Sequence, residues 1–428
     1  MQPTVELKSH ARSALIGASV LALIALLIPH RAWTVMLGAL LGLIGLSYYW
    51  MRSLADNIEI TREVNARWVS VGDYLSETFT LTNHSTLPLI WAEVVDESTV
   101  PGYHVASVRA AGGHQSVRWR EQAICERRGR FQLGPWSLRT SDPFGLFEVT
   151  VRHEQTQEIV IHPPIYTALP VPLPMGSGSG ELRSLRRREQ ALVNVSSVRD
   201  YRPNDPLKHI HWPSTAKHGD LLVRQFDEDS GGDVWILVDL FQPAQVGRGR
   251  DGTEEHAVLL AASLAAKALA VNRPVGLVAY GDEPQIVSPN HGEGQRWQIL
   301  RSLALISAEN SHIPLKQAVA DLRRMVNRGA AVLVISADQS ADWLPDLFRL
   351  AQQGVNVHAV LFDKLTFDPD AARDAAQTAY SIQRELNRLN IESTILQQGD
   401  LGRPTTETPS NREVVFTPLG RAIVRGGA

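Results

Sequence analysis

The chain has 428 residues, with 42 Lys and Arg against 45 Asp and Glu and a formal net charge of −3. This near-neutral balance excludes a global attraction for nucleic acid, and the length exceeds what one ordinary core contains. Because Cys125 is the only cysteine, an intrachain disulfide, a cysteine-rich zinc site and a redox pair are excluded.

Residues 1–54 are predicted to form a transmembrane hairpin. Two charge-free runs, at about 13–29 and 32–50, each approach the roughly 20 residues that a helix needs to cross a bilayer. The residues between them, "IPHRAW", allow only a tight turn. A signal peptide fits less well because a second apolar run follows at once, and a buried soluble hairpin is the other alternative. Basic residues flank the entry and exit, which predicts a cytoplasmic location for the remainder: Lys8, Arg12, Arg52, Arg62 and Arg67.

Residues 55–165 are predicted to form an antiparallel β-sandwich. Short stretches of β-branched and aromatic residues, such as "YLSETFTLTN" and "FEVTV", alternate with turn sequences. In "SDPFG", Asp142, Pro143 and Gly145 occupy favoured positions of a type I turn, and we expect Phe144 to cap the sandwich. If the topology were reversed, this domain would instead be an extracytoplasmic adhesion module.

Residues 166–197 are predicted to be a linker, because proline spacing and a Gly/Ser tract offer little to bury. The arginines that follow this tract are interpreted as a solvated face, or as a contact for anionic lipid headgroups: Arg183, Arg186, Arg187 and Arg188. The tail 399–428 is expected to be largely loose.

Residues 233–398 alternate apolar strands such as "VWILVD" and "AAVLVISAD" with helical segments such as "EEHAVLLAASLAAKALAVN". Continuous apolar strands separated by helices predict an α/β domain with a largely parallel sheet covered on both faces. Asp239 ends the first strand, where open α/β sheets usually bind ligands.

Residues 198–232 are unusually rich in charged and aromatic side chains, which favours either an internally paired loop or a recognition surface. His209 and His211 lack the further ligands that a zinc site needs. Interleaved carboxylates argue against nucleic acid as a partner. The residues that stand out are Arg199, Tyr201, Asp205, Lys208, Ile210, Trp212 and Arg224.

This segment resembles the signature of the family called domain of unknown function 58, which reads approximately Arg-x-Tyr-x-x-Gly-Asp-x-x-Arg-x-Ile-x-Trp. The sequence departs from it at Asn204 and Lys208, where the family has glycine and arginine. Lys208 keeps the charge but loses the bidentate fork. The upstream "ERRGRFQLGPWSLRTSDPFGLFEV" (126–149) is similar to further elements of the family, and the double-spanning amino terminus fits it as well.

The resemblance implies a membrane protein that joins a β-sandwich to a von Willebrand factor A-like (Rossmann-like) domain. It also implies a MoxR-type AAA+ ATPase as partner, often together with a transglutaminase-like membrane protein. In such a domain a metal site combines Asp-x-Ser-x-Ser, a threonine and a second aspartate around Mg²⁺. Here Asp239 and Asp338 stand at carboxylate positions, but Phe241 and Gln242-Pro243 replace the serines, and "AENSHIPLK" offers Ser311 and His312 but no threonine.

We therefore expect a non-enzymatic adaptor in the inner membrane that needs no cofactor and uses protein–protein contacts in the assembly or maturation of complexes. No P-loop motif occurs in the sequence, so any nucleotide chemistry must come from a partner. The alternative is a divalent-metal-dependent hydrolase that uses Asp239, Asp338 and His312 around a water-activating ion.

Overall fold

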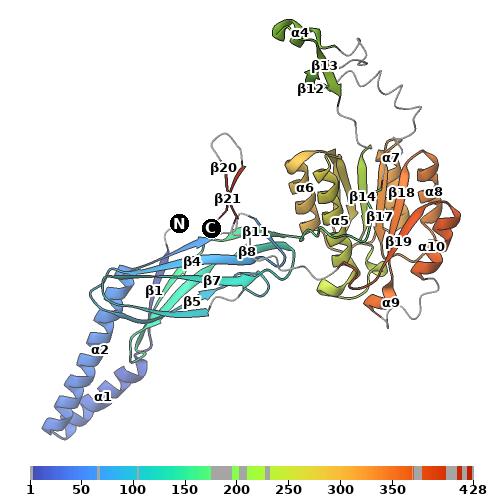
Figure 1. The fold of residues 1–428 in the computed structure, drawn as a ribbon. Helices are drawn as coiled ribbons and strands as arrows, with labels where there is room; N and C mark the ends of the chain where they lie inside the picture. The colour runs from blue at the N-terminus through green and yellow to red at the C-terminus, as the bar shows by residue number, and fades with distance from the viewer. Residues whose placement is uncertain are drawn as a thin grey trace. The chain divides into compact units, whose positions relative to one another are not determined.

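The computed structural model describes residues 3–64, 68–103, 106–174, 195–201, 210–226, 232–368, 370, 378–401, 412–416 and 422–426. The chain divides into two compact units. One comprises Met1–His162 with Thr405–Ala428, and the other comprises Pro163–Pro404. We call them the β unit and the α/β unit and describe each by itself (Figure 1).

Two apolar helices follow the first strand of the β unit. Strand β1 (Thr4–Ser9) precedes α1 (Arg12–Leu27) and α2 (Arg31–Asn57). Helix α2 is long and apolar enough to cross a membrane, whereas α1 is shorter. Helix α2 continues beyond the predicted boundary at residue 50, because Met51, Leu54 and Ala55 follow helical spacing and are buried in the core of the β unit.

The rest of the β unit consists mainly of antiparallel strands. Five strands pair in the order β1-β10-β9-β5-β6, three in the order β2-β4-β7 and three in the order β3-β11-β8, and their buried side chains form one hydrophobic cluster. In β4, apolar side chains at alternate positions, Leu75, Phe79 and Leu81 among them, point into this cluster. The bounds are β2 Ile58–Val64, β3 Val69–Ser70, β4 Tyr74–Asn83, β5 Leu89–Asp96, β6 Ala106–Ala111, β7 Gln115–Ile124, β8 Gly129–Leu133, β9 Trp136–Ser141, β10 Phe147–His153 and β11 Gln157–His162.

The α/β unit contains a six-stranded sheet in the order β16-β15-β14-β17-β18-β19. Only β16 runs antiparallel to its neighbour. Counted along the chain the order is 3-2-1-4-5-6, the doubly wound arrangement. The strands are β14 Val234–Asp239, β15 Val275–Tyr280, β16 Pro284–Asn290, β17 Ala331–Ser336, β18 Asn356–Phe362 and β19 Glu392–Leu396.

Helices cover both faces of this sheet, which is why the central strands are buried throughout and almost entirely apolar. Helices α5 (Thr253–Ala270) and α6 (Gly292–Leu305) contribute to one hydrophobic cluster. Helices α7 (Leu315–Met325), α8 (Leu344–Gln352) and α10 (Ala379–Arg388) contribute to a second cluster. The expectation of a mostly parallel sheet between two helical layers is met.

The segment rich in charged and aromatic residues forms a small substructure. Strands β12 (Val195–Asp200) and β13 (Leu222–Phe226) pair antiparallel, and α4 (Trp212–His218) lies between them in the chain. Helix α4 ends at Gly219, whose φ of 85° is a left-handed conformation that glycine adopts without strain.

Two segments expected to be loose contain ordered structure. Residues 163–174, which include the start of the predicted linker, lie against the α/β unit: Val171 is buried in its core, and Arg273 Nη1 donates to the Pro174 carbonyl at 2.7 Å. The apolar residues between the prolines, Leu169 and Val171 among them, explain this packing. Within the tail, β20 (Arg412–Phe416) pairs with β21 (Ala422–Gly426). Residues 175–194, with the predicted arginine run, lie outside the described residues.

Candidate functional site

The candidate site lies where the connections from the sheet diverge. Strands β14 and β17 are parallel neighbours, and the chain leaves β14 toward β15 on one side and β17 toward β18 on the other. In doubly wound sheets this switch point is the usual place for ligands. The register aligns Val238 with Ile335, so the next residues, Asp239 and Ser336, end the two strands side by side.

The side chain of Asp239 is buried and hydrogen-bonded on both oxygens. The residue is only 3% exposed. Ser336 Oγ donates to Oδ2 at 2.6 Å, and the backbone N–H of Phe241 donates to Oδ1 at 3.1 Å. Ser336 Oγ in turn accepts from the backbone N–H of Asp338 at 2.7 Å. One hydroxyl therefore links the two aspartates named from the sequence.

Asp338 lies at the same edge of the sheet, but its carboxylate accepts hydrogen bonds from Ser340 of the same loop. Ser340 donates to it through its backbone N–H at 2.8 Å and through its hydroxyl at 2.9 Å. The structure therefore brings Asp239 and Asp338 together through Ser336 and does not make them chelate a common point. The sequence analysis missed Ser336, although a serine ending "VLVIS" is the signal that identifies it.

Burial raises the pKa of Asp239 to about 6, although the hydrogen bonds from Ser336 and Phe241 act in the opposite direction. The charge of Asp338 raises this pKa further, and that of Lys364 lowers it. Lys364 begins the short helix α9 (Lys364–Phe367), directly after β18. Burial lowers the pKa of Lys364, and the two aspartates partly offset that effect. Lys364 therefore supplies positive charge to this edge of the sheet, a role that the sequence analysis did not foresee.

The oxygens at this site do not fit a divalent cation. Phe241 is half-buried, and Gln242–Ala244 form a short 3-10 helix where the serines of a metal site would lie. Ser311 donates its hydroxyl to the Tyr280 carbonyl at 2.8 Å. His312 is exposed, and it makes no hydrogen bond to Asp239 or Asp338. Throughout the part of the chain that the structure describes, no three His, Cys, Asp or Glu side chains gather in a way that could hold a metal.

The second predicted site, between β12 and β13, has a buried part and an exposed part. Ile210 is buried and forms a bridge with Val223, and the Tyr201 N–H donates to the Leu221 carbonyl at 2.9 Å. Trp212, in contrast, is 62% exposed at the start of α4. The backbones of Arg199 and Arg224 lie on the paired strands. Their side chains, like Asp205 and Lys208, fall outside the described residues.

A polar cluster in the β unit was not anticipated, because Arg62 was interpreted only as a charge flanking the membrane. Its side chain is 7% exposed and donates through Nε and Nη2 to the two oxygens of Glu77, both at 2.7 Å. Nη2 also pairs with Asp96 Oδ2 at 2.9 Å, and Tyr103 donates its hydroxyl to Glu77. We call these four residues the Arg62 cluster.

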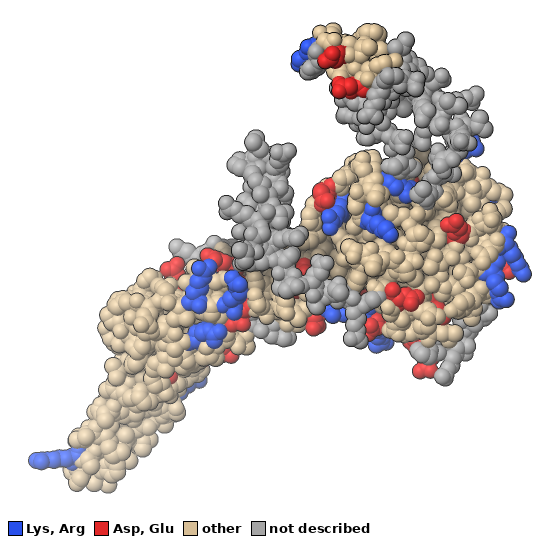
Figure 2. All heavy atoms as spheres, in the orientation of Figure 1, with Lys and Arg blue, Asp and Glu red and all other residues tan. Residues whose placement is uncertain are grey.

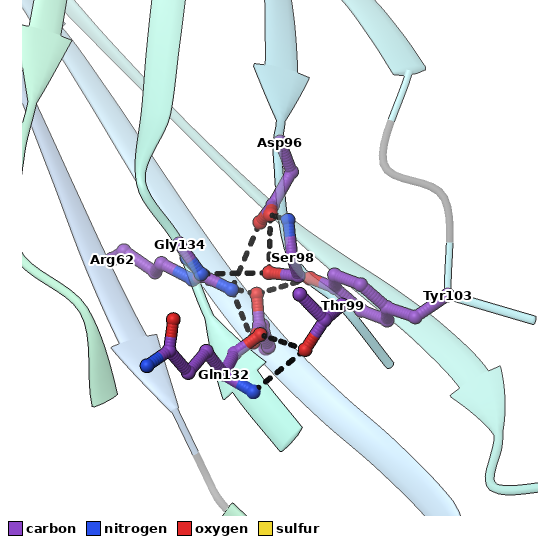
Figure 3. Close-up of polar contacts among 8 residues, drawn as sticks. Arg62, Asp96, Ser98, Thr99, Tyr103, Gln132 and Gly134 are labelled. Atoms are coloured by element: carbon purple, nitrogen blue, oxygen red, sulfur yellow. Dashed lines mark hydrogen bonds and ion pairs between the residues drawn. The ribbon is translucent and has the colours of Figure 1, made fainter. Parts of the chain in front are cut away.

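Figure 3 shows how loops extend the Arg62 cluster. The Ser98 N–H donates to Asp96 at 2.6 Å, and the Gly134 N–H donates to Ser98 Oγ at 2.7 Å. Thr99 Oγ1 accepts from the Gln132 N–H at 2.8 Å. These bonds join β2, β4 and β5 to the loop before β9. The side chains of Arg62, Glu77 and Asp96 are buried and contact one another, so we assign the cluster a structural role.

Strand order, the antiparallel edge strand and an aspartate at the switch point together define an α/β domain of the von Willebrand factor A-like class. Within it, residues 197–366 match the model of the family described as "Protein of unknown function DUF58". The resemblance stated from the signature residues is confirmed.

A curated relative, "Uncharacterized protein YeaD" of Bacillus subtilis (strain 168), is 23% identical over 367 residues, covering 84% of this chain and 86% of that protein. Among solved structures, an aerotolerance-related membrane protein from Bacteroides fragilis NCTC 9343 is 15% identical. It covers 40% of this chain and 94% of its own, with a TM-score of 0.30. A von Willebrand factor type A protein from Catenulispora acidiphila is 10% identical, covers 45% of each chain and has a TM-score of 0.27. With TM-scores this low, the fold class rests on strand order and register alone.

Proposed function

We propose that this protein is a membrane-anchored accessory protein that acts through protein–protein contacts and is not itself a catalyst. The observation that carries the proposal is the state of Asp239. Both of its oxygens accept hydrogen bonds from neutral groups of its own chain, Ser336 and the Phe241 N–H. Asp239 is also only 3% exposed, so its remaining lone pairs have little access to the ligand or substrate that an ion-binding or proton-transferring carboxylate must reach.

The anchor in this proposal is a two-pass hairpin of α1 and α2 in the inner membrane, with both soluble units in the cytoplasm. It is supported by the exposed apolar side chains along both helices, Ile16, Leu26 and Val35 among them. The excess of basic residues at the entry and exit supports the orientation. In this proposal the sheets of the β unit form a sandwich above the membrane.

The proposed partner is a MoxR-type AAA+ ATPase, as the family resemblance implies, with a transglutaminase-like membrane protein as a further component. The chain has no P-loop of its own, so energy from nucleotide hydrolysis has to come from a partner. Trp212 is the docking residue that we propose, because an exposed tryptophan, here at the start of α4, is typical of an interface hot spot.

The test is co-purification of the full-length protein in detergent with the MoxR-type ATPase encoded by the same genome. Trp212→Ala is expected to weaken binding by more than about tenfold, the loss typical of a hot-spot residue. Trp297→Ala on α6 is the matched control, since Trp297 is also a partly exposed tryptophan of the α/β unit. Equal binding by the two variants, both folded, would refute the docking assignment.

The hydrolase alternative has its own readout. Isothermal titration of the full-length protein with Mg²⁺ and Mn²⁺ is expected to give no saturable heat, because no three His, Cys, Asp or Glu side chains gather to hold a metal among the described residues and Asp239 is only 3% exposed. Saturable binding that disappears in Asp239→Asn would instead favour a metal-dependent activity using Asp239 and Asp338.

A further inference from the structure

The strand directions give the β unit two distinct ends. Helix α1 begins and α2 ends at the same end, which we call the helix end. Three loops lie there, as backbone hydrogen bonds demonstrate. The His10 N–H donates to the Leu146 carbonyl at 2.8 Å, the His84 N–H to the Asn57 carbonyl at 2.9 Å, and the His114 N–H to the Ser85 carbonyl at 3.1 Å. The loops are residues 84–88, 112–114 and 142–146.

These three loops expose no carboxylate. Their sequences are "HSTLP", "GGH" and "DPFGL", and the one acid, Asp142, is buried and accepts from the N–H groups of Phe144 and Phe147 at 3.0 and 2.6 Å. Acids just outside the loops, Asp56, Glu59 and Glu148, lie within 4 Å of the basic side chains Arg52, His84 and His10. At the opposite end of the same strands, the chain exposes Glu97, Glu126 and Glu154 directly after β5, β7 and β10.

Phe144 is the large apolar side chain that these loops expose. It is 57% exposed at the tip of the turn, where Gly145 takes a φ of 67°. The expectation that Phe144 caps the sandwich is therefore wrong. The hydrogen bonds to Asp142 shape a turn whose tip points away from the core, so the core does not bury the Phe144 ring.

Three consecutive aromatic residues of α2 lie level with these loops. The Tyr48 ring packs edge-on against Phe147, with centroids 5.6 Å apart, and Trp50 Nε1 donates to the Pro88 carbonyl at 3.1 Å. Tyr49 is exposed between them. Tyrosine and tryptophan concentrate at the boundary between headgroups and acyl chains, so these side chains set the depth at which a bilayer would begin.

The lengths of the helices agree with this depth. Helix α1 has 16 residues, which at 1.5 Å per residue span about 24 Å, and the part of α2 from Arg31 to the aromatic residues spans about as much. A bilayer core of about 30 Å would take up all of both segments. In Figure 2 the outer part of the two helices carries a single basic group at its tip, in keeping with Arg31 as the only Lys, Arg, Asp or Glu between Arg12 and Arg52.

We infer that residues 84–88, 112–114 and 142–146 form a membrane-seating surface, on which the β unit rests directly on the lipid with Phe144 inserted at the interface. No length of helix is left over to hold the unit away from the bilayer. The inference rests on the proposed two-pass anchor and adds to it a second, peripheral contact. The occupant of the surface is the headgroup layer of a bilayer, which tolerates aromatic and small polar side chains and repels exposed carboxylates.

The chain offers a clean way to test this. Its one cysteine, Cys125, is buried, and burial raises the pKa of its thiol to about 11, so it should resist labelling by thiol reagents. Phe144→Cys and the control Tyr74→Cys can therefore each carry a single fluorescent label. Tyr74 is comparably exposed but begins β4 at the opposite end of the unit.

The labelled full-length variants are reconstituted in vesicles of phosphatidylethanolamine and phosphatidylglycerol that contain phosphatidylcholine brominated near the top of its acyl chains. The label at 144 is expected to lose most of its fluorescence to the brominated lipid and to be shielded from aqueous iodide. The label at 74 is expected to behave in the opposite way. Equal quenching of both labels by iodide, with neither quenched by brominated lipid, would overturn the seating surface.

Carbonate extraction of the same vesicles separates this outcome from failure of the anchor. Protein that stays in the membrane pellet while its label at 144 remains accessible to iodide contradicts only the seating. Protein released by carbonate contradicts the anchor, and the seating with it.

Discussion

The two units bury carboxylates in opposite ways. In the β unit, Glu77 and Asp96 are neutralised by the guanidinium of Arg62, which reaches both of them. In the α/β unit, Asp239 receives only neutral donors, and the ammonium of Lys364 acts on it without forming an ion pair within 4.0 Å among the described residues. The carboxylates of Glu77 and Asp96 are thus paired with a positive charge, whereas that of Asp239 accepts hydrogen bonds only from neutral groups.

The difference separates groups that hold the fold together from a group that weakens it. A buried charge is tolerated when it is paired with an opposite charge, as Glu77 and Asp96 are with Arg62. A carboxylate whose pKa is raised on folding destabilises the folded state at neutral pH. The switch point of the α/β sheet thus retains an unfavourable charge, which is the pattern expected of a position kept for reasons other than stability.

The largest expected effect comes from removing the cation of the Arg62 cluster. Arg62→Met leaves Glu77 and Asp96 buried without compensation and is expected to cost about 3–5 kcal/mol of unfolding free energy. Arg118→Met is the control, because Arg118 pairs with Glu63 at 3.1 Å with both side chains exposed, and such pairs contribute less than about 1 kcal/mol. Denaturant unfolding of the full-length protein in detergent measures the loss of unfolding free energy in both variants. Similar losses would contradict the view that Arg62 neutralises buried carboxylates.

A second test concerns pH. The pKa of Asp239 rises from 3.8 to about 6 on folding, so the folded state binds this proton more tightly. Its contribution to stability therefore increases as the pH falls through about 6 and is complete below 3.8, amounting to about 3 kcal/mol. Asp239→Asn is expected to stabilise the α/β unit at pH 8 and to lack the gain between pH 6 and 4.

Unfolding of the α/β unit can be followed by tryptophan fluorescence, since Trp235 is buried in β14, the strand that ends at Asp239. Asp342→Asn removes the same charge from an exposed position and serves as the control. A wild-type stability that stays flat or falls between pH 6 and 4, relative to Asp239→Asn, would contradict the buried-charge description.

A smaller effect is expected from the hydroxyl that links the two aspartates. Ser336→Ala removes the donor to Asp239 and the acceptor for the Asp338 N–H and is expected to cost about 1–3 kcal/mol. It should also raise the pKa of Asp239, and with it the pH at which the stability gain begins, because the lost hydrogen bond stabilised the ionised carboxylate. Ser340→Ala, which disturbs only Asp338, should leave that pKa unchanged.

Periodicity and turn chemistry were sufficient to predict the alternating α/β pattern, the position of Asp239 at a strand end and the shape of the "SDPFG" turn. These depend on local spacing and on which residues a buried parallel strand accepts. The family resemblance also came from contiguous residues, Arg199 to Phe226, whose spacing can be read directly from the sequence.

What sequence reasoning missed depends on residues that are distant in the chain. Arg62, Glu77 and Asp96 lie on three strands, and only the register of the sheets brings them together. Lys364 reaches the switch point because β18 ends beside β17, which follows from strand order. The aromatic residues of α2 were read as part of an apolar run, and only the fold brings them level with the turn at Phe144.

The helices α1 and α2 are inserted into the β unit, because β1 precedes them and pairs with β10, with Thr4 opposite Arg152. The proposed anchor therefore cannot be removed without damage to the β unit: a fragment starting after Asn57 loses the edge strand β1 and the core side chains Met51 and Leu54. During synthesis, β1 is made first, and its partner β10 is made only after both helices and strands β2 to β9. If the proposed anchor is correct, insertion of the helices into the bilayer and closure of this sheet are successive steps of one assembly process.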